Sequence, residues 1–256
     1  MNIEEKKKLL ELALNKGNYP EVLYKYRTVE QLKKILENNS FWFASPDSFN
    51  DPFDCSLSEV ESYDLDDARA YFRSLRIKED IIEQTIEMFQ KNPSKLYDCV
   101  NKVKKTTLNN KGILALSSCN DDILMWSHYA DNHKGIAIGL EVRKDLEFFL
   151  MPINIDYRDT YEALNYLKNS QQAIDDTLKL KSSAWSYEKE VRIYKDGNGL
   201  YTIKPKAIKE ICFGVKASNE DIDNIKKICA QKGFEDIFFY KARKIHAQFG
   251  IKFEAI

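Results

Sequence analysis

The sequence of 256 residues contains no apolar run long enough to cross a membrane. Its longest apolar stretches, such as Ile136 to Leu140, have the length of a strand, whereas a membrane-spanning helix needs about 20 apolar residues. Residues 1–8 are largely charged and lack the apolar segment of a signal peptide. We therefore expect a protein that does not enter a membrane and that works in the cytoplasm.

Cysteine, histidine and glycine are scarce and form no recognised motif. The 5 cysteines have no Cys-x-x-Cys spacing and the 3 histidines are scattered, so we expect reduced thiols and no metal site. The 9 glycines form no glycine-rich loop of the kind that cradles phosphate groups in Rossmann and P-loop proteins. The sequence therefore does not indicate either of those two nucleotide-binding folds.

Neither sign of charge is in excess. The chain has 39 basic and 40 acidic residues, which give a formal net charge of −1. No overall field would attract such a chain to nucleic acid. The 43% of hydrophobic and 31% of charged residues are instead typical of a folded globular protein.

Helix and strand signals follow one another along the chain without a linker. Helices are predicted at residues 3–16, 28–39, 122–129, 159–182 and 218–231, and Thr28 to Gln31 form a capping box at the start of the second. Two or three charged helices, with breaks near residues 77–78 and 92–93, form an insertion at 64–109. Strands are predicted at 22–27, 41–44, 112–118, 135–142, 153–157, 189–194, 208–213, 237–240 and 251–253. This pattern predicts an α+β fold with a mixed or split β-sheet core and surrounding helices. We expect this fold to form a single domain over residues 1–256, with an N-terminal helix within residues 1–17.

Four short segments are more polar and more aromatic than a scaffold requires. The first is Tyr24 to Arg27, in which strand alternation places Lys25 and Arg27 on one face. A guanidinium at a strand end binds phosphate or carboxylate in a bidentate manner, but a solvated edge strand gives the same pattern. In the second segment, Phe49 to Phe53, Asn50 or Asp51 either organises a site or simply stabilises a turn.

The third segment is a short helix around residues 126–130. Helical spacing places Trp126 and Tyr129 on one face and points His128 away from it. We expect Trp126 in the core, and a buried Tyr129 needs a partner for its hydroxyl group. His128 is able to titrate near neutral pH, although a lone histidine also serves structural roles.

The fourth segment runs from Trp185 to Arg192. In an extended chain Glu188, Glu190 and Arg192 lie on one face. Two carboxylates beside a guanidinium form either a surface ion-pair ladder or a catalytic strand. The Trp and Tyr residues that lead into the strand favour the second interpretation.

These four segments, together with the strand that begins at Gly135, resemble the bacterial domain-of-unknown-function family 2971. The resemblance spans roughly residues 22 to 215. The family name implies no activity.

The layout is also similar to that of ADP-ribosyltransferases, which hold NAD in a split sheet. These enzymes use a first-strand Arg or His, a central Ser or Tyr, and a late strand with a catalytic Glu, often as Glu-x-Glu. Here Arg27 or Tyr26 precedes a helix, Ser117 and Tyr129 lie mid-chain, and Glu188-Lys189-Glu190 opens a late strand. The chain departs from the pattern in three ways: it has no Ser-Thr-Ser, no first-strand His, and extra helices at 64–109.

This layout implies an enzyme that uses NAD as its substrate, without a metal. Glu190 would be the catalytic carboxylate, Glu188 would orient the acceptor, Arg27 would hold the pyrophosphate and Tyr129 would stack on a ring. The other residues expected to bind NAD are Tyr26, Asn50, Asp51, Ser117 and His128. The acceptor is a protein, a nucleic acid or a small molecule.

Two other functions are compatible with the same residues. One is a non-catalytic module that binds a nucleotide or a protein without turnover. The other is a metal-dependent nuclease-like hydrolase in which Asp51, Glu188 and Glu190 hold a divalent ion.

Overall fold

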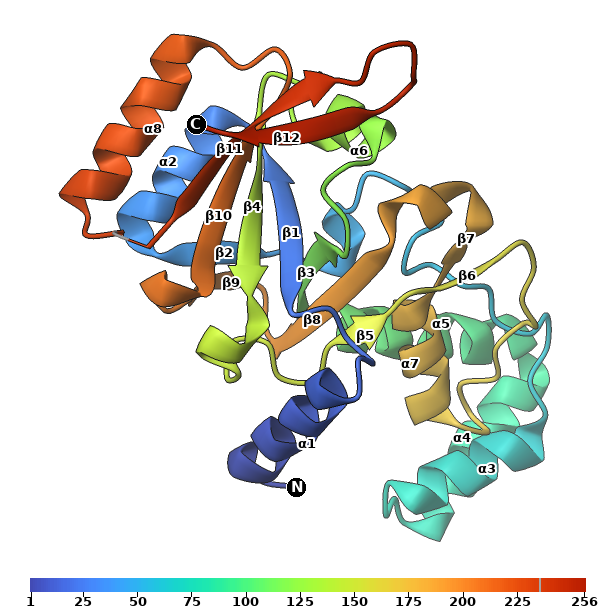
Figure 1. Cartoon of the computed structure of the whole chain (residues 1–256). Coiled ribbons are helices and arrows are strands. Elements are labelled where there is room, and N and C mark those ends of the chain that lie inside the picture. Colours follow the sequence, from blue (N-terminus) through green and yellow to red (C-terminus); the bar gives the residue numbers. More distant parts are fainter. Residues whose placement is uncertain (235) are drawn as a thin grey trace.

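A computed structural model describes residues 1–234 and 236–256, and an eight-stranded sheet lies at its centre (Figure 1). In spatial order its strands are β12 (Ile251–Ala255), β11 (Phe238–Lys244), β10 (Ile208–Phe213), β4 (Ile136–Glu141), β1 (Val22–Arg27), β3 (Lys111–Ser117), β8 (Glu190–Asp196) and β5 (Ile153–Asn154). The pairing of β10 with β11 is parallel, and the other pairings of this sheet are antiparallel. The predicted α+β fold with a mixed sheet is therefore confirmed.

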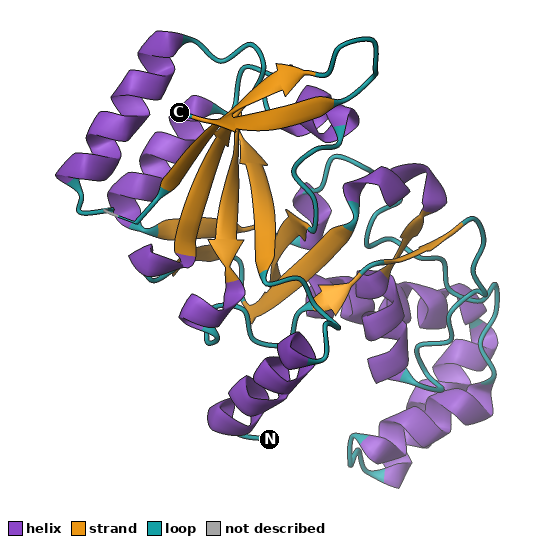
Figure 2. Cartoon of the chain, in the orientation of Figure 1, coloured by secondary structure: helices purple, strands orange, loops and turns teal. Residues whose placement is uncertain are grey.

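Helices cover both faces of the sheet (Figure 2). On one face α2 (Val29–Asn38) and α8 (Asn219–Gln231) lie side by side, and their apolar residues share a core with the strands. Thr28 caps α2 as predicted, because its side chain accepts a hydrogen bond from the Gln31 amide while the Gln31 side chain accepts one from the Thr28 amide. On the other face α6 (Ile123–Tyr129) buries Trp126 edge-on against Tyr26, with 5.3 Å between ring centroids.

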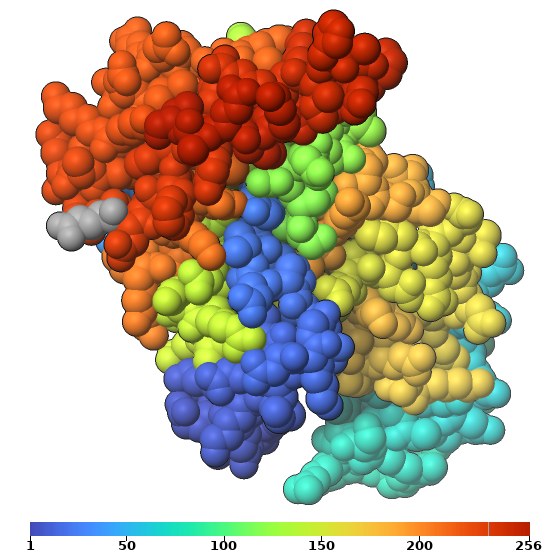
Figure 3. Space-filling model, in the orientation of Figure 1, coloured from blue at the N-terminus to red at the C-terminus, as the bar shows by residue number. Residues whose placement is uncertain are grey.

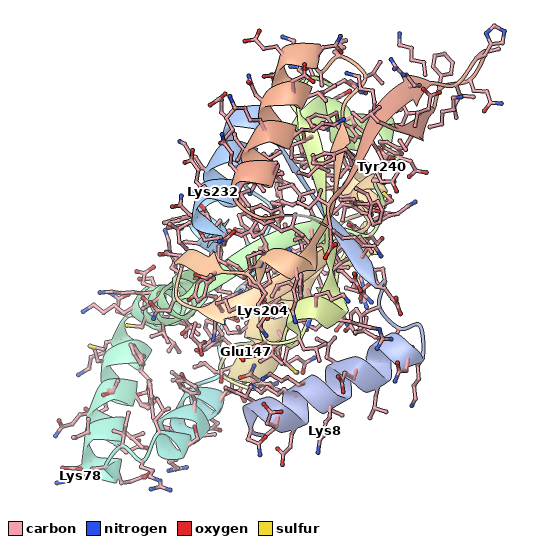
Figure 4. All side chains as sticks on the ribbon, turned by 60° about the vertical axis from the view of Figure 1, so that its left-hand side comes forward. Lys8, Lys78, Glu147, Lys204, Lys232 and Tyr240 are labelled. Carbon is pink, nitrogen blue, oxygen red and sulfur yellow. The ribbon has the colours of Figure 1, made fainter. Side chains whose placement is uncertain are left out.

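The predicted helical insertion forms one end of the molecule. It consists of α3 (Leu65–Ser74), α4 (Glu79–Lys91) and α5 (Pro93–Asn109), and the breaks fall where the sequence predicts them. Together with α7 (Ser170–Lys179) these helices surround an apolar cluster that reaches the sheet at Ile113 and Tyr194. Lys78, between α3 and α4, lies at the tip of this end, apart from α1 (Ile3–Asn15), which carries Lys8 (Figure 4). Lys232 and Tyr240 lie in the other half of the molecule. Residues 208–234 and 236–256 occupy that opposite end (Figure 3).

Two expectations about local structure are wrong. The predicted helix at 159–182 is confined to α7, because the Asn169 side chain caps its start and residues 180–182 form a strand. That strand, β7 (Leu180–Ser182), pairs with β6 (Asp156–Arg158), so the predicted strand 153–157 is divided between two sheets. The strand predicted at 41–44 is confirmed as β2 (Ser40–Phe43). It pairs outside the main sheet with β9 (Gly199–Thr202), a strand that the sequence did not reveal.

The central sheet is split between β1 and β3. Strand β1 pairs with β4 along its whole length, from Val22 to Arg27, but it pairs with β3 only where Tyr24 lies opposite Ser117. Beyond that point the two strands diverge, which is visible as the gap between the blue β1 and the green β3 in Figure 1.

Among the described residues, no helix has the length and apolar character to span a membrane.

Candidate functional site

A cavity of about 280 Å³ lies at the split between β1 and β3. It is bordered by β1, the end of β3, the segment 48–54, α6, β7 and the 3-10 helix Ser183–Glu188. Its volume is close to the lower limit of about 300 Å³ for small-molecule sites. We therefore expect it to enclose one part of a dinucleotide rather than the whole molecule.

Most of the residues selected from the sequence meet in this cavity. It is lined by Tyr26, Arg27, Asn50, Ser117, Tyr129, Glu188 and Glu190. Asp51 is not among them, because its side chain accepts the Phe53 amide at 2.9 Å and faces a different cavity. His128 is exposed, and its Nδ1 lies 3.0 Å from the hydroxyl of Tyr187. The expected binding roles of Asp51 and His128 therefore have no support in the geometry of this cavity.

Sheet register aligns three of the lining positions. Tyr24 on β1 lies opposite Ser117 on β3, and Ser117 lies opposite Glu190 on β8. Because β1, β3 and β8 are neighbours, this row crosses the split in the sheet and runs along the floor of the cavity. Arg27 follows on the same strand as Tyr24, at the end of β1.

Glu188 and Glu190 reach the cavity by a route that the sequence did not indicate. The predicted strand face with both carboxylates is wrong, because Glu188 ends the 3-10 helix and β8 begins at Glu190. Between them Lys189 has a left-handed conformation with φ 44°. The Ser117 hydroxyl donates to the Glu188 carbonyl at 2.7 Å, which fixes the chain at this turn. The strand does not form a surface ion-pair ladder, since Arg192 is 0% exposed.

A buried network of charged side chains forms one wall. Arg192 Nε donates to Glu190 Oε1 at 2.6 Å, and Arg192 Nη2 donates to both oxygens of Asp54 at 2.8 and 2.7 Å. Lys181 Nζ lies 2.8 Å from Glu190 Oε2, 2.5 Å from Glu188 Oε2 and 3.3 Å from Asp54 Oδ2. Three carboxylates thus share two cations, so the network retains one negative charge when all five groups are ionised.

The two glutamates of the network titrate in different ranges. Burial alone would raise the pKa of Glu190, but the charges of Arg192 and Lys181 outweigh it and lower the pKa to about 2. For Glu188, burial raises the pKa, and Lys181 and the Tyr129 hydroxyl, which donates to Oε1 at 2.5 Å, offset only part of that effect. One cavity thus contains two carboxylates whose environments separate their pKa values, an arrangement typical of acid–base sites.

This difference predicts how acid affects a Glu190→Gln variant. Folding lowers the pKa of Glu190 from 4.5 to about 2. The charge of Glu190 therefore stabilises the fold fully above pH 4.5, and this contribution to stability is lost as the pH falls towards 2. The gap in unfolding free energy between wild type and variant should therefore be widest above pH 4.5 and should narrow below it. Urea denaturation at several pH values measures this gap, and a gap that stays constant with pH would contradict the assignment.

Two cations of the cavity have no carboxylate partner. Within the described part of the chain, no carboxylate oxygen lies within 4.0 Å of Lys25 or Arg27. Lys25 Nζ donates to the carbonyl of Ala115, and Arg27 Nη1 donates to the carbonyl of Tyr26 at 3.2 Å. Burial lowers the pKa of Arg27 to about 10 and, together with the charge of Arg27, lowers that of Lys25 well below its usual range. A half-buried cation without a carboxylate partner is costly, so Arg27 makes this side of the cavity suitable for an anionic group.

Sequence reasoning missed two charged residues of the site. Asp54 directly follows the Phe49–Phe53 segment, so its position in the chain was a usable signal. Lys181 gave no signal, because it lies in a segment predicted as helical and far in sequence from its partners.

The ring of Phe49 lies under the guanidinium of Arg192, with 5.4 Å from Cζ to the ring centroid.

The charged network differs from a metal site. Within residues 1–234 and 236–256, no group of three or more His, Cys, Asp or Glu side chains is placed to hold a metal ion. Asp54, Glu188 and Glu190 approach one another, but Lys181 contacts all three. Asp51, which the nuclease interpretation requires, faces another cavity.

Comparison with known proteins supports the family resemblance. Residues 125–193 match the model of the family described as "Protein of unknown function (DUF2971)", which confirms the resemblance drawn from the sequence. The matched segment contains Tyr129, Lys181, Glu188, Glu190 and Arg192, whereas Arg27 and the segment 48–54 lie outside it. No curated protein and no solved structure matches the chain.

Proposed function

We propose that the cavity binds NAD and that the protein transfers the ADP-ribosyl group of NAD to an acceptor. The observation that carries this proposal is the meeting of Arg27, Ser117 and the Glu188–Glu190 pair at a split in the sheet. Three neighbouring strands or their ends supply a cation, a hydroxyl and a carboxylate in the order that the ADP-ribosyltransferase layout requires. Nothing in this arrangement specifies the acceptor.

The charge distribution favours Glu188 over Glu190 as the carboxylate beside the bond that breaks. Cleavage of the nicotinamide–ribose bond builds positive charge on the ribose, and a nearby negative charge stabilises it. Glu190 is held between Arg192 and Lys181, so two cations already neutralise its charge. Glu188 contacts Lys181 and the neutral Tyr129 hydroxyl, so the excess negative charge of the network is available at Glu188.

The opposite side of the cavity suits the phosphates of the same ligand. Arg27, at the end of β1, lines the cavity together with Asn50. A guanidinium binds phosphate oxygens in a bidentate manner. The ribose would then lie between Arg27 and Glu188, and the adenosine part would extend beyond the enclosed volume.

Thermal stability separates this proposal from the alternatives. A ligand that binds the native state raises the melting temperature. We expect NAD and ADP-ribose to raise it and Mg²⁺ or Mn²⁺ alone to leave it unchanged. Stabilisation by divalent ions but not by NAD would favour the nuclease-like hydrolase. Stabilisation by NAD without release of nicotinamide would favour the binding module.

Replacing Arg27 with glutamine should weaken NAD binding by about 10- to 100-fold, because a charge-assisted hydrogen bond contributes about 1.5–3 kcal/mol. Isothermal titration calorimetry measures this loss. Arg143→Gln is the matched control, since Arg143 pairs with Glu21 on the surface and lies outside the cavity. Equal NAD affinity of the Arg27 variant and the wild type would exclude a phosphate-binding role for this residue.

A further inference from the structure

The geometry points to Lys25 as a nucleophile: we infer that its amine attacks the anomeric carbon of the bound ribose and forms a covalent ribosyl–lysine adduct. This inference rests on the proposed binding of NAD. It assigns a modification site to a residue that the ADP-ribosyltransferase layout does not use.

The position of Lys25 follows from the split in the sheet. Its backbone is fixed on β1, where it lies opposite Ile138 of β4. On the other side β1 leaves β3 after the Tyr24–Ser117 pair, and the Lys25 side chain donates to the carbonyl of Ala115 on β3. Lys25 therefore lies at the opening between the two strands, where the cavity begins.

The amine has capacity left for a ligand. An ammonium group has three donors, and the carbonyl of Ala115 is the hydrogen-bond partner of Lys25 Nζ within the described residues. No carboxylate there lies within 4.0 Å to hold the group in its charged form. Lys25 lines the same cavity as Glu188 and Glu190.

The surroundings favour the neutral amine that a nucleophile requires. Burial and the neighbouring Arg27 lower the pKa of Lys25, and the charges of Glu190 and Glu188 reverse only part of this shift. A lysine whose ammonium form is destabilised by burial and by a second cation is a typical activated amine. Lys25 thus differs from Lys181, whose three carboxylate contacts keep it protonated.

The step balances without a further reactant. The bond from Lys25 Nζ to C1′ of the ribose forms as the bond from C1′ to the nicotinamide nitrogen breaks. The electron pair of the broken bond stays on nicotinamide, which leaves as a neutral molecule. The new secondary ammonium then loses one proton to solvent, and no oxidation or reduction occurs.

Lys241 is a matched control within the same chain. Like Lys25, it lies on a strand, donates to a backbone carbonyl (that of Ala217), and has a pKa lowered by burial. It does not line the cavity. General reactivity of buried lysines would modify both residues, whereas reaction inside the cavity modifies Lys25 alone.

Peptide mapping by mass spectrometry tests the inference. Wild-type protein is incubated with NAD and sodium cyanoborohydride, which reduces the open-chain imine form of the adduct to a stable amine. We expect the peptide that contains Lys25 to gain the mass of one ADP-ribosyl group plus the two hydrogens of the reduction, and the peptide that contains Lys241 to gain none. We also expect Lys25→Arg to lose the adduct and Lys241→Arg to retain it.

Three results would overturn the inference. Nicotinamide release without an adduct on Lys25 would leave the proposed function intact and exclude the nucleophile. Equal modification with free ADP-ribose in place of NAD would show simple glycation, as would equal modification of Lys25 and Lys241. Absence of both nicotinamide release and adduct would overturn the proposed function together with this inference.

Discussion

Replacing Arg192 with methionine should lower the free energy of unfolding by about 3–5 kcal/mol, because removal of one partner leaves buried charges without compensation. The guanidinium donates to Glu190 and to both oxygens of Asp54. Methionine preserves much of the side-chain volume but leaves these two carboxylates with Lys181 as their shared cation. Urea denaturation of the wild type and the variant measures the difference.

A surface ion pair provides the matched control. Arg73 pairs with Glu79, and the two side chains are 55% and 58% exposed. Arg73→Met should therefore change the unfolding free energy by less than about 1 kcal/mol. If the Arg192 and Arg73 variants lost similar stability, the buried network would not be a major structural element of this fold.

The second large effect is expected for Glu188→Gln. The amide preserves the shape of the side chain but removes the charge opposite the developing positive charge on ribose. We expect NAD affinity to stay within a few-fold of the wild type and nicotinamide release to fall by on the order of 10²-fold or more. Calorimetry with NAD and chromatographic assay of nicotinamide measure the two quantities separately.

Glu59→Gln distinguishes this loss from simple destabilisation. Glu59 is a buried carboxylate that accepts a hydrogen bond from Lys104 at 2.7 Å, and it does not line the cavity. Its replacement should destabilise the protein yet leave the folded fraction active. Wild-type nicotinamide release by Glu188→Gln would remove this residue from the mechanism.

Local sequence signals predicted much of the fold. The capping box at Thr28 and the breaks near residues 78 and 92 depend on neighbouring residues, so α2 to α5 appear where the sequence places them. The strands of the central sheet were also recognisable from their apolar runs. Strand β9 was missed because it has only 4 residues and its partner β2 lies far away in the sequence.

The site was only partly predictable, because long-range pairing determines it. The residues that line the cavity were selected for unusual polarity, and most of them do converge. The role of Lys181 depends on β7 pairing with β6, which no local pattern encodes. The approach of Glu188 depends on the left-handed conformation of Lys189. The alternation of side chains along an extended strand cannot reveal such a conformation.

Nicotinamide release from NAD by the purified wild-type protein tests the central claim most directly. The assay follows NAD and nicotinamide by chromatography, with and without cell extract as a source of acceptor. We predict that NAD is consumed, that nicotinamide appears in equal amount, and that the extract accelerates both. NAD that remains intact under all these conditions would contradict the transferase function.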